Sequence, residues 1–296
     1  MATNSFSNKK ELRFVITLAT GNFGTNTATN QITLEGYRAS INVDRGGALQ
    51  MGTLHAKIWG LSQADMSSAT TMQWTPQTFM KNQIQVFAID GPQVSLVFSG
   101  VIVNAWGIYD AMPNVYLMIQ AQVGYWSQIQ PVTPVSIKAG TPIAPLFDQY
   151  AAAMGLAFQN EGVTGSTTSN LYLPGTNIEQ LNSLALQTGV SRFISGDNGT
   201  LYISPPNTPL QGEIVLVSSD TGLKGYPIFD GVGVNFRMLY NPAIQINRKI
   251  QLQTNVIRAN GVWIVLNMAF DLDSELPNGN WYATVRGNKN GFAVYQ

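Results

Sequence analysis

Three acidic residues near the C-terminus have a spacing that could hold a cation. Asp271, Asp273 and Glu275 alternate along the end of an expected strand, so their carboxylates would point to the same side. A calcium loop of the EF-hand type needs Gly at its sixth position, and this chain has Leu276 there. Polar hydrogen bonding at a strand-to-turn corner is the better interpretation, and no metal ligand is assigned.

Nucleophilic and acid–base chemistry has little support in the residue types present. His55 is the only histidine and the chain has no cysteine, so a Ser-His-Asp triad or a Cys-based metal site lacks its parts. Glu161 and Glu179 can be nominated as a glycosidase pair, but spacing in sequence does not give the carboxylate separation which that mechanism requires. We interpret His55 as structural and the two glutamates as coincidental.

Two short motifs resemble known signatures but lack the context that these need. Gly231-Val232-Gly233 begins like a dinucleotide fingerprint, yet the third Gly is missing and a strand is expected next, in place of a helix. Asn198-Gly199-Thr200 fits a glycosylation sequon but lies in an expected hairpin turn. Both are interpreted as turns, so no catalytic, cofactor-binding or metal-binding residue is assigned.

The composition indicates a protein that is surrounded by other subunits. Only 11% of the 296 residues are charged, against about a quarter in ordinary soluble domains. Asn, Gln, Ser and Thr take the place of charge, and charged residues are the ones depleted at the cores of interfaces. A net charge of zero argues against a nucleic-acid-reading protein. The start of the chain lacks the apolar segment of a secretory signal, so synthesis in a cytosol is expected.

The elements that would position these residues form two β blocks around an insert. Alternating apolar residues and Gly-containing turns predict a first block, residues 1–130, with strands at 11–20, 31–34, 38–43, 49–59, 82–88, 94–106 and 115–126. Within this block, Ser62 is the expected N-cap of a short helix that reaches Ala69. This spacing of strands is typical of a barrel or sandwich.

The segment 131–205 is predicted to be a small α/β insert. Thr141 and Pro142 would begin a helix that stops at Gly155, and Asn177 with Gln180 would cap a second helix that ends at Gly189. A hairpin with strands at 192–194 and 201–203 follows.

After the Pro-rich stretch 205–209, β structure is expected to return in a second block, residues 206–296. Its predicted strands lie at 214–217, 233–239, 249–257, 262–271 and 281–286, with Asn260-Gly261 as a hairpin turn. No short-period repeat is present, although the two β blocks could be related to one another.

An ordered set of segments in the second half resembles a known family. These segments are Thr141-Pro142-Ile143, Asn177 to Gly189, the hairpin around Asp197-Asn198-Gly199, Gly222 to Pro227, Tyr240-Asn241-Pro242, Asn260 to Val265, Leu272-Asp273-Ser274 and Gly279-Asn280-Trp281. In this order they resemble the baseplate hub proteins of contractile-tailed bacteriophages, a group related to the late control D family and to the hub part of type VI secretion spikes.

The resemblance implies a fold and a set of partners. The fold would be mainly β with an α+β insert, in which two tail-tube-like β-barrel domains form a homotrimeric, pseudo-hexameric ring. The ring would join a hexameric tail tube or tube-initiator protein to a trimeric central spike, with the tape measure protein as a further partner. DNA would pass through its lumen without specific binding, and the protein would belong to the virion tail baseplate after assembly in the host cytoplasm. No cofactor, enzymatic activity or stable membrane association is implied.

Two other function classes remain open at this stage. One is a tail-associated cell-wall hydrolase. The other is a carbohydrate-binding or receptor-binding β module, for which exposed Trp74, Trp106 and Trp126 would supply the aromatic surface, although aromatics more often fill cores and interfaces.

Overall fold

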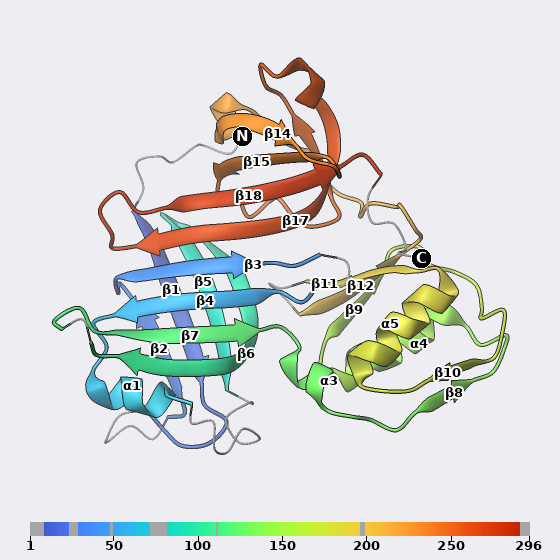
Figure 1. Cartoon of the computed structure of the whole chain (residues 1–296), viewed down its shortest axis with the longest axis horizontal. Coiled ribbons are helices and arrows are strands. Elements are labelled where there is room, and N and C mark those ends of the chain that lie inside the picture. Colours follow the sequence, from blue (N-terminus) through green and yellow to red (C-terminus); the bar gives the residue numbers. More distant parts are fainter. Residues whose placement is uncertain are drawn as a thin grey trace.

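The computed structural model describes residues 9–23, 29–47, 50–71, 82–110, 112–195 and 199–290, and its fold is mainly β (Figure 1). The first block contains β1 (Lys10–Thr17), β2 (Gln31–Glu35), β3 (Ala39–Asp44), β4 (Thr53–Trp59), α1 (Gln63–Ala69), β5 (Gln83–Asp90), β6 (Gln93–Ile108), β7 (Tyr116–Gln122) and α3 (Tyr125–Ile129). No helix in the described ranges is long and apolar enough to cross a membrane.

The remaining elements form the insert and the second block. The insert contains β8 (Val135–Ile137), α4 (Ile143–Ala153), β9 (Ala157–Asn160), β10 (Leu171–Leu173), α5 (Asn177–Thr188), β11 (Ser191–Ile194) and β12 (Thr200–Ser204). The second block contains β13 (Val215–Val217), the 3₁₀ turn Ser219–Thr221, β14 (Leu223–Phe229), β15 (Val234–Leu239), β16 (Lys249–Leu252), the 3₁₀ turn Ile257–Ala259, β17 (Gly261–Ser274) and β18 (Trp281–Asn288).

A single sheet runs through both β blocks. Its strand order is β14-β15-β18-β17-β3-β4-β7-β6-β5-β1-β2. In addition, β16 pairs with β17, and β13 pairs with β16. The blocks join where β3 lies antiparallel to the end of β17, with Ala39 opposite Ser274 and Asp44 opposite Ala269. The described strands do not close into a barrel, because their path is open and ends at β14 and β2, so the expectation of two tail-tube-like β-barrel domains is met only as a mainly β fold.

The sheet has one buried and one exposed face, because five of its strands alternate strictly. In β3, β4, β7, β15 and β18 every second side chain is buried, and the intervening ones are partly or fully exposed. The long strands β6 and β17 each contain a bulge, between Ile102 and Asn104 and between Val265 and Asn267. Bulges bend a strand, and in Figure 1 β1 and β5 cross behind β3, β4 and β7. The apolar side chains of these layers face inward and form the core.

The insert is a small α/β unit beside the sheet (Figure 1). Strands β11 and β12 form the predicted hairpin, and β9 adds in parallel to β12. Tyr150 of α4 donates to the amide oxygen of Gln180 of α5 at 2.9 Å, in a buried position. Burial raises the pKa of the Tyr150 hydroxyl. The boundaries 1–130, 131–205 and 206–296 remain a prediction.

Several sequence-based boundaries are wrong for local reasons. The strand expected at 115–126 ends at Gln122, because Gly124 takes a left-handed conformation and Trp126 lies in α3. Thr141 does not cap α4, whose N-cap is Pro142 without a side-chain hydrogen bond. In α5 the cap is Thr176, one residue before the expected Asn177, and Glu179 completes the capping box in place of Gln180.

The Asn260-Gly261 turn is also corrected. Strands β16 and β17 pair as expected, but Leu252 lies opposite Gly261, so residues 253–260 form the connection. The side chain of Asn260 accepts from the backbone N–H of Thr254 at 2.6 Å, which closes a longer loop. Ser62 does cap α1 as predicted, accepting from the N–H of Asp65.

Candidate functional site

The three acidic residues near the C-terminus each have a separate partner. Asp271 accepts a hydrogen bond from the side-chain amide of Asn42 at 2.7 Å. Asp273 accepts from the backbone and side-chain N–H groups of Asn280 at 2.7 and 3.1 Å. Glu275 forms an ion pair with Lys9 at 2.5 Å. Polar bonding at a strand-to-turn corner is therefore confirmed for Asp273, and within the described ranges no cluster of three metal-binding side chains occurs.

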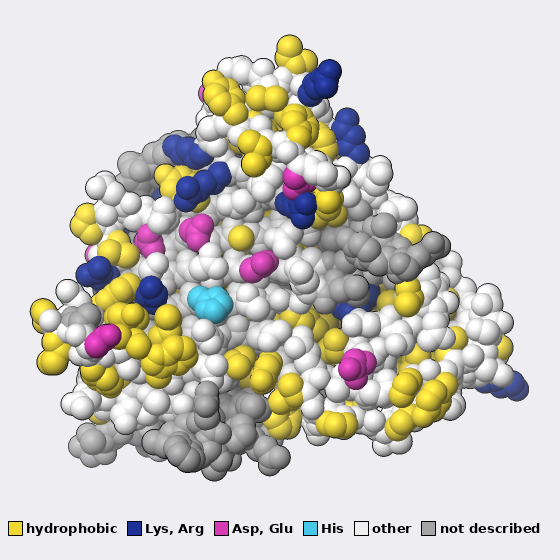
Figure 2. Space-filling model, in the orientation of Figure 1, with side chains coloured by type: hydrophobic (Ala, Val, Ile, Leu, Met, Phe, Trp, Pro, Cys, Tyr) yellow, Lys and Arg dark blue, Asp and Glu magenta, His cyan; other side chains and the backbone are white. Residues whose placement is uncertain are grey.

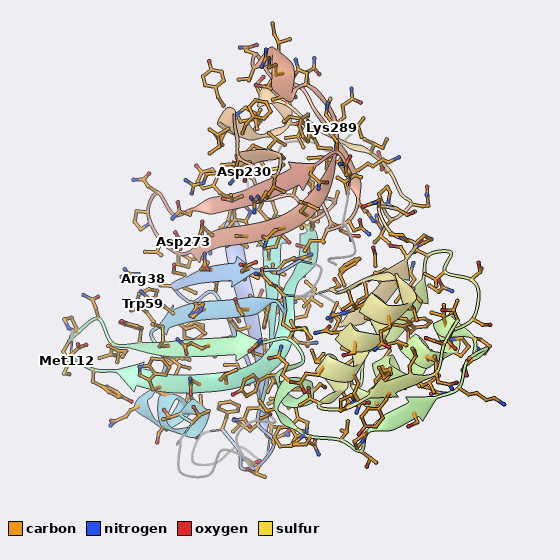
Figure 3. All side chains as sticks on the ribbon, turned by 45° about the vertical axis from the view of Figure 1, so that its right-hand side comes forward. Arg38, Trp59, Met112, Asp230, Asp273 and Lys289 are labelled. Carbon is orange, nitrogen blue, oxygen red and sulfur yellow. The ribbon has the colours of Figure 1, made fainter. Side chains whose placement is uncertain are left out.

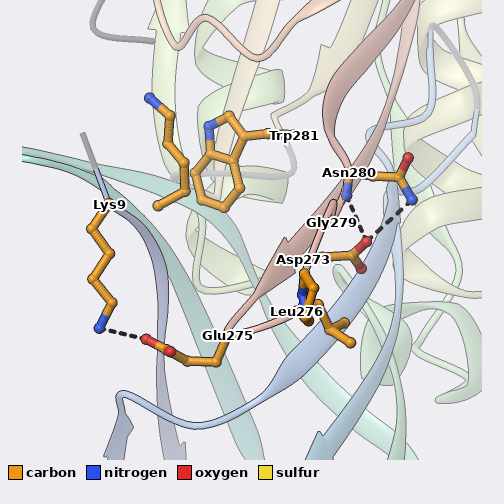
Figure 4. Close-up of a pocket in the computed structure, with 9 residues that line it drawn as sticks. Lys9, Asp273, Glu275, Leu276, Gly279, Asn280 and Trp281 are labelled. Atoms are coloured by element: carbon orange, nitrogen blue, oxygen red, sulfur yellow. Dashed lines mark hydrogen bonds and ion pairs between the residues drawn. The ribbon is translucent and has the colours of Figure 1, made fainter. Parts of the chain in front are cut away.

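An open pocket of about 420 Å³ lies where the start of β1 meets the turn between β17 and β18 (Figure 4). Lys9 approaches from one side, and Asp273, Glu275 and Trp281 line the other. The Lys9 ammonium group donates to the carboxylates of Glu11 and Glu275, and these two hydrogen bonds raise its pKa. The charged groups of the pocket thus fasten the N-terminal strand to the β17–β18 turn.

The other chemical candidates lie apart from this pocket. His55 is exposed on β4, opposite Asn42 of β3 and Gln120 of β7. Glu161 accepts from the side chain of Gln159 within the insert, whereas Glu179 serves the cap of α5. Glu161 and Glu179 thus make separate local hydrogen bonds within the insert, and the structural interpretation of His55 remains a prediction.

The glycine motif forms a turn, as predicted. The carboxylate of Asp230 accepts from the N–H groups of Val232 and Gly233 at 2.8 and 2.9 Å, between β14 and β15. These two hydrogen bonds, with a further one from Arg286, hold the pKa of Asp230 below its usual value. Asn198 of the sequon and Trp74 lie outside the described residues.

One continuous feature is the polar face of the sheet, defined by the outward side chains of β15, β18, β17, β3, β4 and β7. One row across it contains Gln120, His55, Asn42, Asp271 and Tyr282 in register. Figure 2 shows the single histidine near the centre of this face with acidic and basic groups dispersed around it.

The two β blocks repeat one pattern of strand pairing. In the first repeat, defined as β3 to β7, the order across the sheet is β3-β4-β7-β6-β5. In the second repeat, defined as β14 to β18, the order is β14-β15-β18-β17-β16, and every neighbouring pair in both repeats is antiparallel. The suggestion from sequence that the two blocks are related is thus supported at the level of strand order.

Individual contacts recur at matching positions of the two repeats. Lys57 lies over the ring of Tyr116 at 5.8 Å in the first repeat, and Arg237 lies over the ring of Tyr282 at 4.3 Å in the second. Figure 3 places Asp230, beyond the end of β14, high on the sheet and Met112, in the β6–β7 turn, far below it.

The backbone bonds that begin and end these strands also match. Trp59 donates to the carbonyl of Arg38 at 2.9 Å, and at the corresponding place Leu239 donates to the carbonyl of Gly222 at 2.9 Å. Sequence reasoning missed this correspondence because most matched positions carry different residue types, for example His55 and Asn235.

Comparison with known proteins places this architecture among phage tail proteins. A tail protein from Neisseria meningitidis MC58 is similar with a TM-score of 0.64 at 10% identity, over 95% of this chain and 98% of that one. The 43 kDa tail protein of prophage MuSo2 from Shewanella oneidensis gives 0.63 at 11% identity, over 96% and 97%.

A component of the type VI secretion system from E. coli, itself structurally similar to the T4 bacteriophage tail proteins gp27 and gp5, gives a TM-score of 0.59 at 5% identity, over 86% of this chain and 75% of that one. No curated protein sequence matches the chain significantly. The model of one protein family, baseplate hub gp41, matches residues 69–287, which is most of the chain. With this match and a tail-protein fold, the chain belongs to the baseplate hub gp41 family.

Proposed function

We propose that the protein is the structural hub of a phage baseplate, a homotrimeric adaptor between a hexameric tail tube or tube-initiator protein and a trimeric central spike. The observation that carries this proposal is the repeated strand order within one continuous sheet. Three chains with two similar repeats each present six similar units, and such a ring matches six-fold symmetry on one side and three-fold symmetry on the other.

The polar face of the sheet is the proposed wall of a DNA conduit. Its charges on β3, β4, β15, β17 and β18 are balanced, with the acidic Asp44, Asp271 and Asp273 against the basic Lys57, Arg237 and Arg286. Each cation held against a phosphate adds affinity through counterion release, so a wall without a continuous basic track lets DNA pass without specific binding.

Further parts of the proposal concern partners and location. The similarity to one chain of a Francisella PdpA–VgrG complex, with a TM-score of 0.59 at 8% identity over 96% of this chain and 59% of that one, supports a spike as the partner on one side. The tape measure protein is the expected contact within the tube, and the insert is expected to lie at the periphery. The protein would be a virion component of the tail baseplate, assembled in the host cytoplasm.

Native mass spectrometry of the purified chain tests the proposal. The expected species has the mass of three 32.2 kDa chains, formed alone or on addition of the tube or spike protein. A monomer at all micromolar concentrations, with and without these partners, would contradict it. Release of soluble fragments from purified peptidoglycan would favour the tail-associated hydrolase, and retention on host glycans would favour the receptor-binding module.

A further inference from the structure

The two repeats meet inside the chain at one junction between strands. Six residue pairs join β3 to the end of β17, from Ala39 opposite Ser274 to Asp44 opposite Ala269. On the inner side of this junction Val43 and Leu272 are fully buried, each 0% exposed. On the polar face Asn42 donates to Asp271 at 2.7 Å. These features provide a template for how one repeat contacts the next.

The same two edges occur a second time, and there no strand of the described ranges joins them. Strand β14 corresponds to β3 and pairs only with β15 among the described strands. Strand β6 corresponds to β17. The first part of β6 pairs with β5 and its last part with β7, just as the first part of β17 pairs with β16 and its last part with β18. The last part of β17 has β3 on its other side, whereas no described strand pairs with the last part of β6 on that side.

The bulges align the two long strands residue by residue. Asn104 and Asn267 are each the first paired residue after the bulge. Counting on from them, Gly107 matches Phe270, and Ile108 matches Asp271. Ile108 and Asp271 lie opposite the corresponding tyrosines, Tyr116 and Tyr282. In the same way Ile228, opposite Asn235, matches Asn42, opposite His55.

Apolar side chains on the two open edges are exposed where their counterparts are buried. Phe229 is 49% exposed, whereas Val43 at the matching position is 0% exposed. Tyr109 comes directly after Ile108, so its matching position is Leu272, which comes directly after Asp271. Tyr109 is 45% exposed, whereas Leu272 is 0% exposed. Val43 and Leu272 each have the other strand of the junction beside them, whereas no described strand lies on the open side of Phe229 or Tyr109. Both edges therefore have the side chains of a junction, and none of the described strands covers them.

We infer that the open edge of β14 in one copy of the chain pairs with the last residues of β6 in the next copy, repeating the register of β3 with β17. Phe229 then lies opposite Gly107 of the neighbouring copy, and Ile228 lies opposite its Ile108. The hydrogen-bonded pair Asn42 and Asp271 is thus replaced by two isoleucines, so both partners change from polar to apolar together. This inference rests on the proposed trimer and specifies the strands that form it.

The ladder at this junction is short. Pro227 has no N–H to donate, which is typical of a strand at the edge of a sheet. At the other end the backbone N–H of Thr71 already donates to the carbonyl of Ala105 at 2.8 Å. Specific contact between copies then depends mainly on the apolar side chains at positions 108, 109, 228 and 229. A heterologous contact of this kind forms a closed ring when its rotation closes.

Cysteine pairs test the register, because the chain has no cysteine of its own. The N–H of Arg45 donates to the carbonyl of Met268, so the pair Asn42 and Asp271 is of the non-hydrogen-bonded type. Cα atoms in such pairs are about 4.5 Å apart, within disulfide range. Ile108→Cys with Ile228→Cys in one chain is expected to give covalent dimers and trimers under oxidation, with the ladder ending at three chains on a non-reducing gel.

Two control variants make the result interpretable. Asn42→Cys with Asp271→Cys should form a disulfide within the monomer, which confirms that this register permits one. Ile228→Cys with Tyr172→Cys, where Tyr172 is exposed on the insert, should give at least tenfold less covalent trimer. An equimolar mixture of the two single variants, Ile108→Cys and Ile228→Cys, should stop at the dimer.

The outcomes separate this inference from the proposed function. A trimer in native mass spectrometry without the cross-link, while the Asn42→Cys and Asp271→Cys control forms, would overturn the junction and leave the trimeric hub intact. A cross-linked ladder that continues beyond three chains would overturn the closed ring. A monomer under all conditions would overturn both.

Discussion

Single carboxylates end corresponding strands in both repeats. Asp44 is the last residue of β3, and its side chain accepts from the N–H of Gly46 at 2.8 Å. Asp230 follows β14 and accepts from Val232 and Gly233, as well as pairing with Arg286 at 2.7 Å. Such Asx turns let a short side chain replace a backbone partner at a strand end.

Replacement of Asp230 by Asn should change how stability depends on pH. The folded-state pKa of Asp230 is lowered, so its carboxylate stabilises the fold above the unfolded-state pKa, and this contribution is lost as pH falls through the folded-state value. Asp230→Asn should lower the melting temperature at pH 7. At pH 2–3 the melting temperatures of wild type and variant should differ less than they do at pH 7. Equal loss at both pH values in thermal denaturation would contradict this account.

Among the elements, helix α5 shows which of two neighbouring residues caps the start of a helix. Thr176 accepts from the N–H of Glu179 at 3.3 Å, and Glu179 accepts from the N–H of Thr176 at 2.8 Å. Gly189 ends the helix in the left-handed conformation, as the sequence predicted.

The capping box gives a matched pair of variants. Thr176→Ala should lower the free energy of unfolding by about 1 kcal/mol, because an orphan N–H loses its partner. Asn177→Ala, at the first helical position, should leave stability unchanged or slightly raised, because Ala has the higher helix propensity. Urea denaturation followed by circular dichroism measures both, and a larger loss for Asn177→Ala would favour the cap expected from sequence.

Local pattern predicted most strands but not those that depend on distant partners. Strands β1 to β7 and β15 to β18 were found because their apolar residues alternate between turns. Strand β14 was missed as an element because Gly225 and Pro227 interrupt its alternation, and its register shifts between Lys224 and Ile228. For the candidate site, the structural roles of Asp273 and of the glycine turn were predicted. The pairing of Asn42 with Asp271, 229 positions apart, has no local signal.

At the scale of the whole molecule, the neutral composition and the balanced polar face both determine the electrostatic field. A protein with few charges, and with acidic and basic groups in equal numbers on the polar face of its sheet, has no strong field along that face. The proposed conduit wall would therefore be passive toward DNA.

DNA binding by the assembled protein tests this passivity. The native assembly should not retard duplex DNA in a gel at 50 mM salt. Gln120→Lys with Asn235→Lys adds cations on both repeats and should give retardation that weakens as salt rises to 200 mM. The same number of lysines on the insert, at Tyr172 and Gln159, serves as the control. Tight, salt-sensitive binding by the unaltered protein would contradict a passive wall.

The β3–β17 junction also determines how the chain responds to force. Two domains joined by a linker bend at a hinge, but here six backbone-paired pairs of residues connect the repeats across one sheet. Turning one repeat against the other would break these hydrogen bonds cooperatively and expose Val43 and Leu272 together. We therefore expect the two repeats to move together as one rigid body. A load applied at one end of the sheet would be transmitted to the other end with little loss to internal motion.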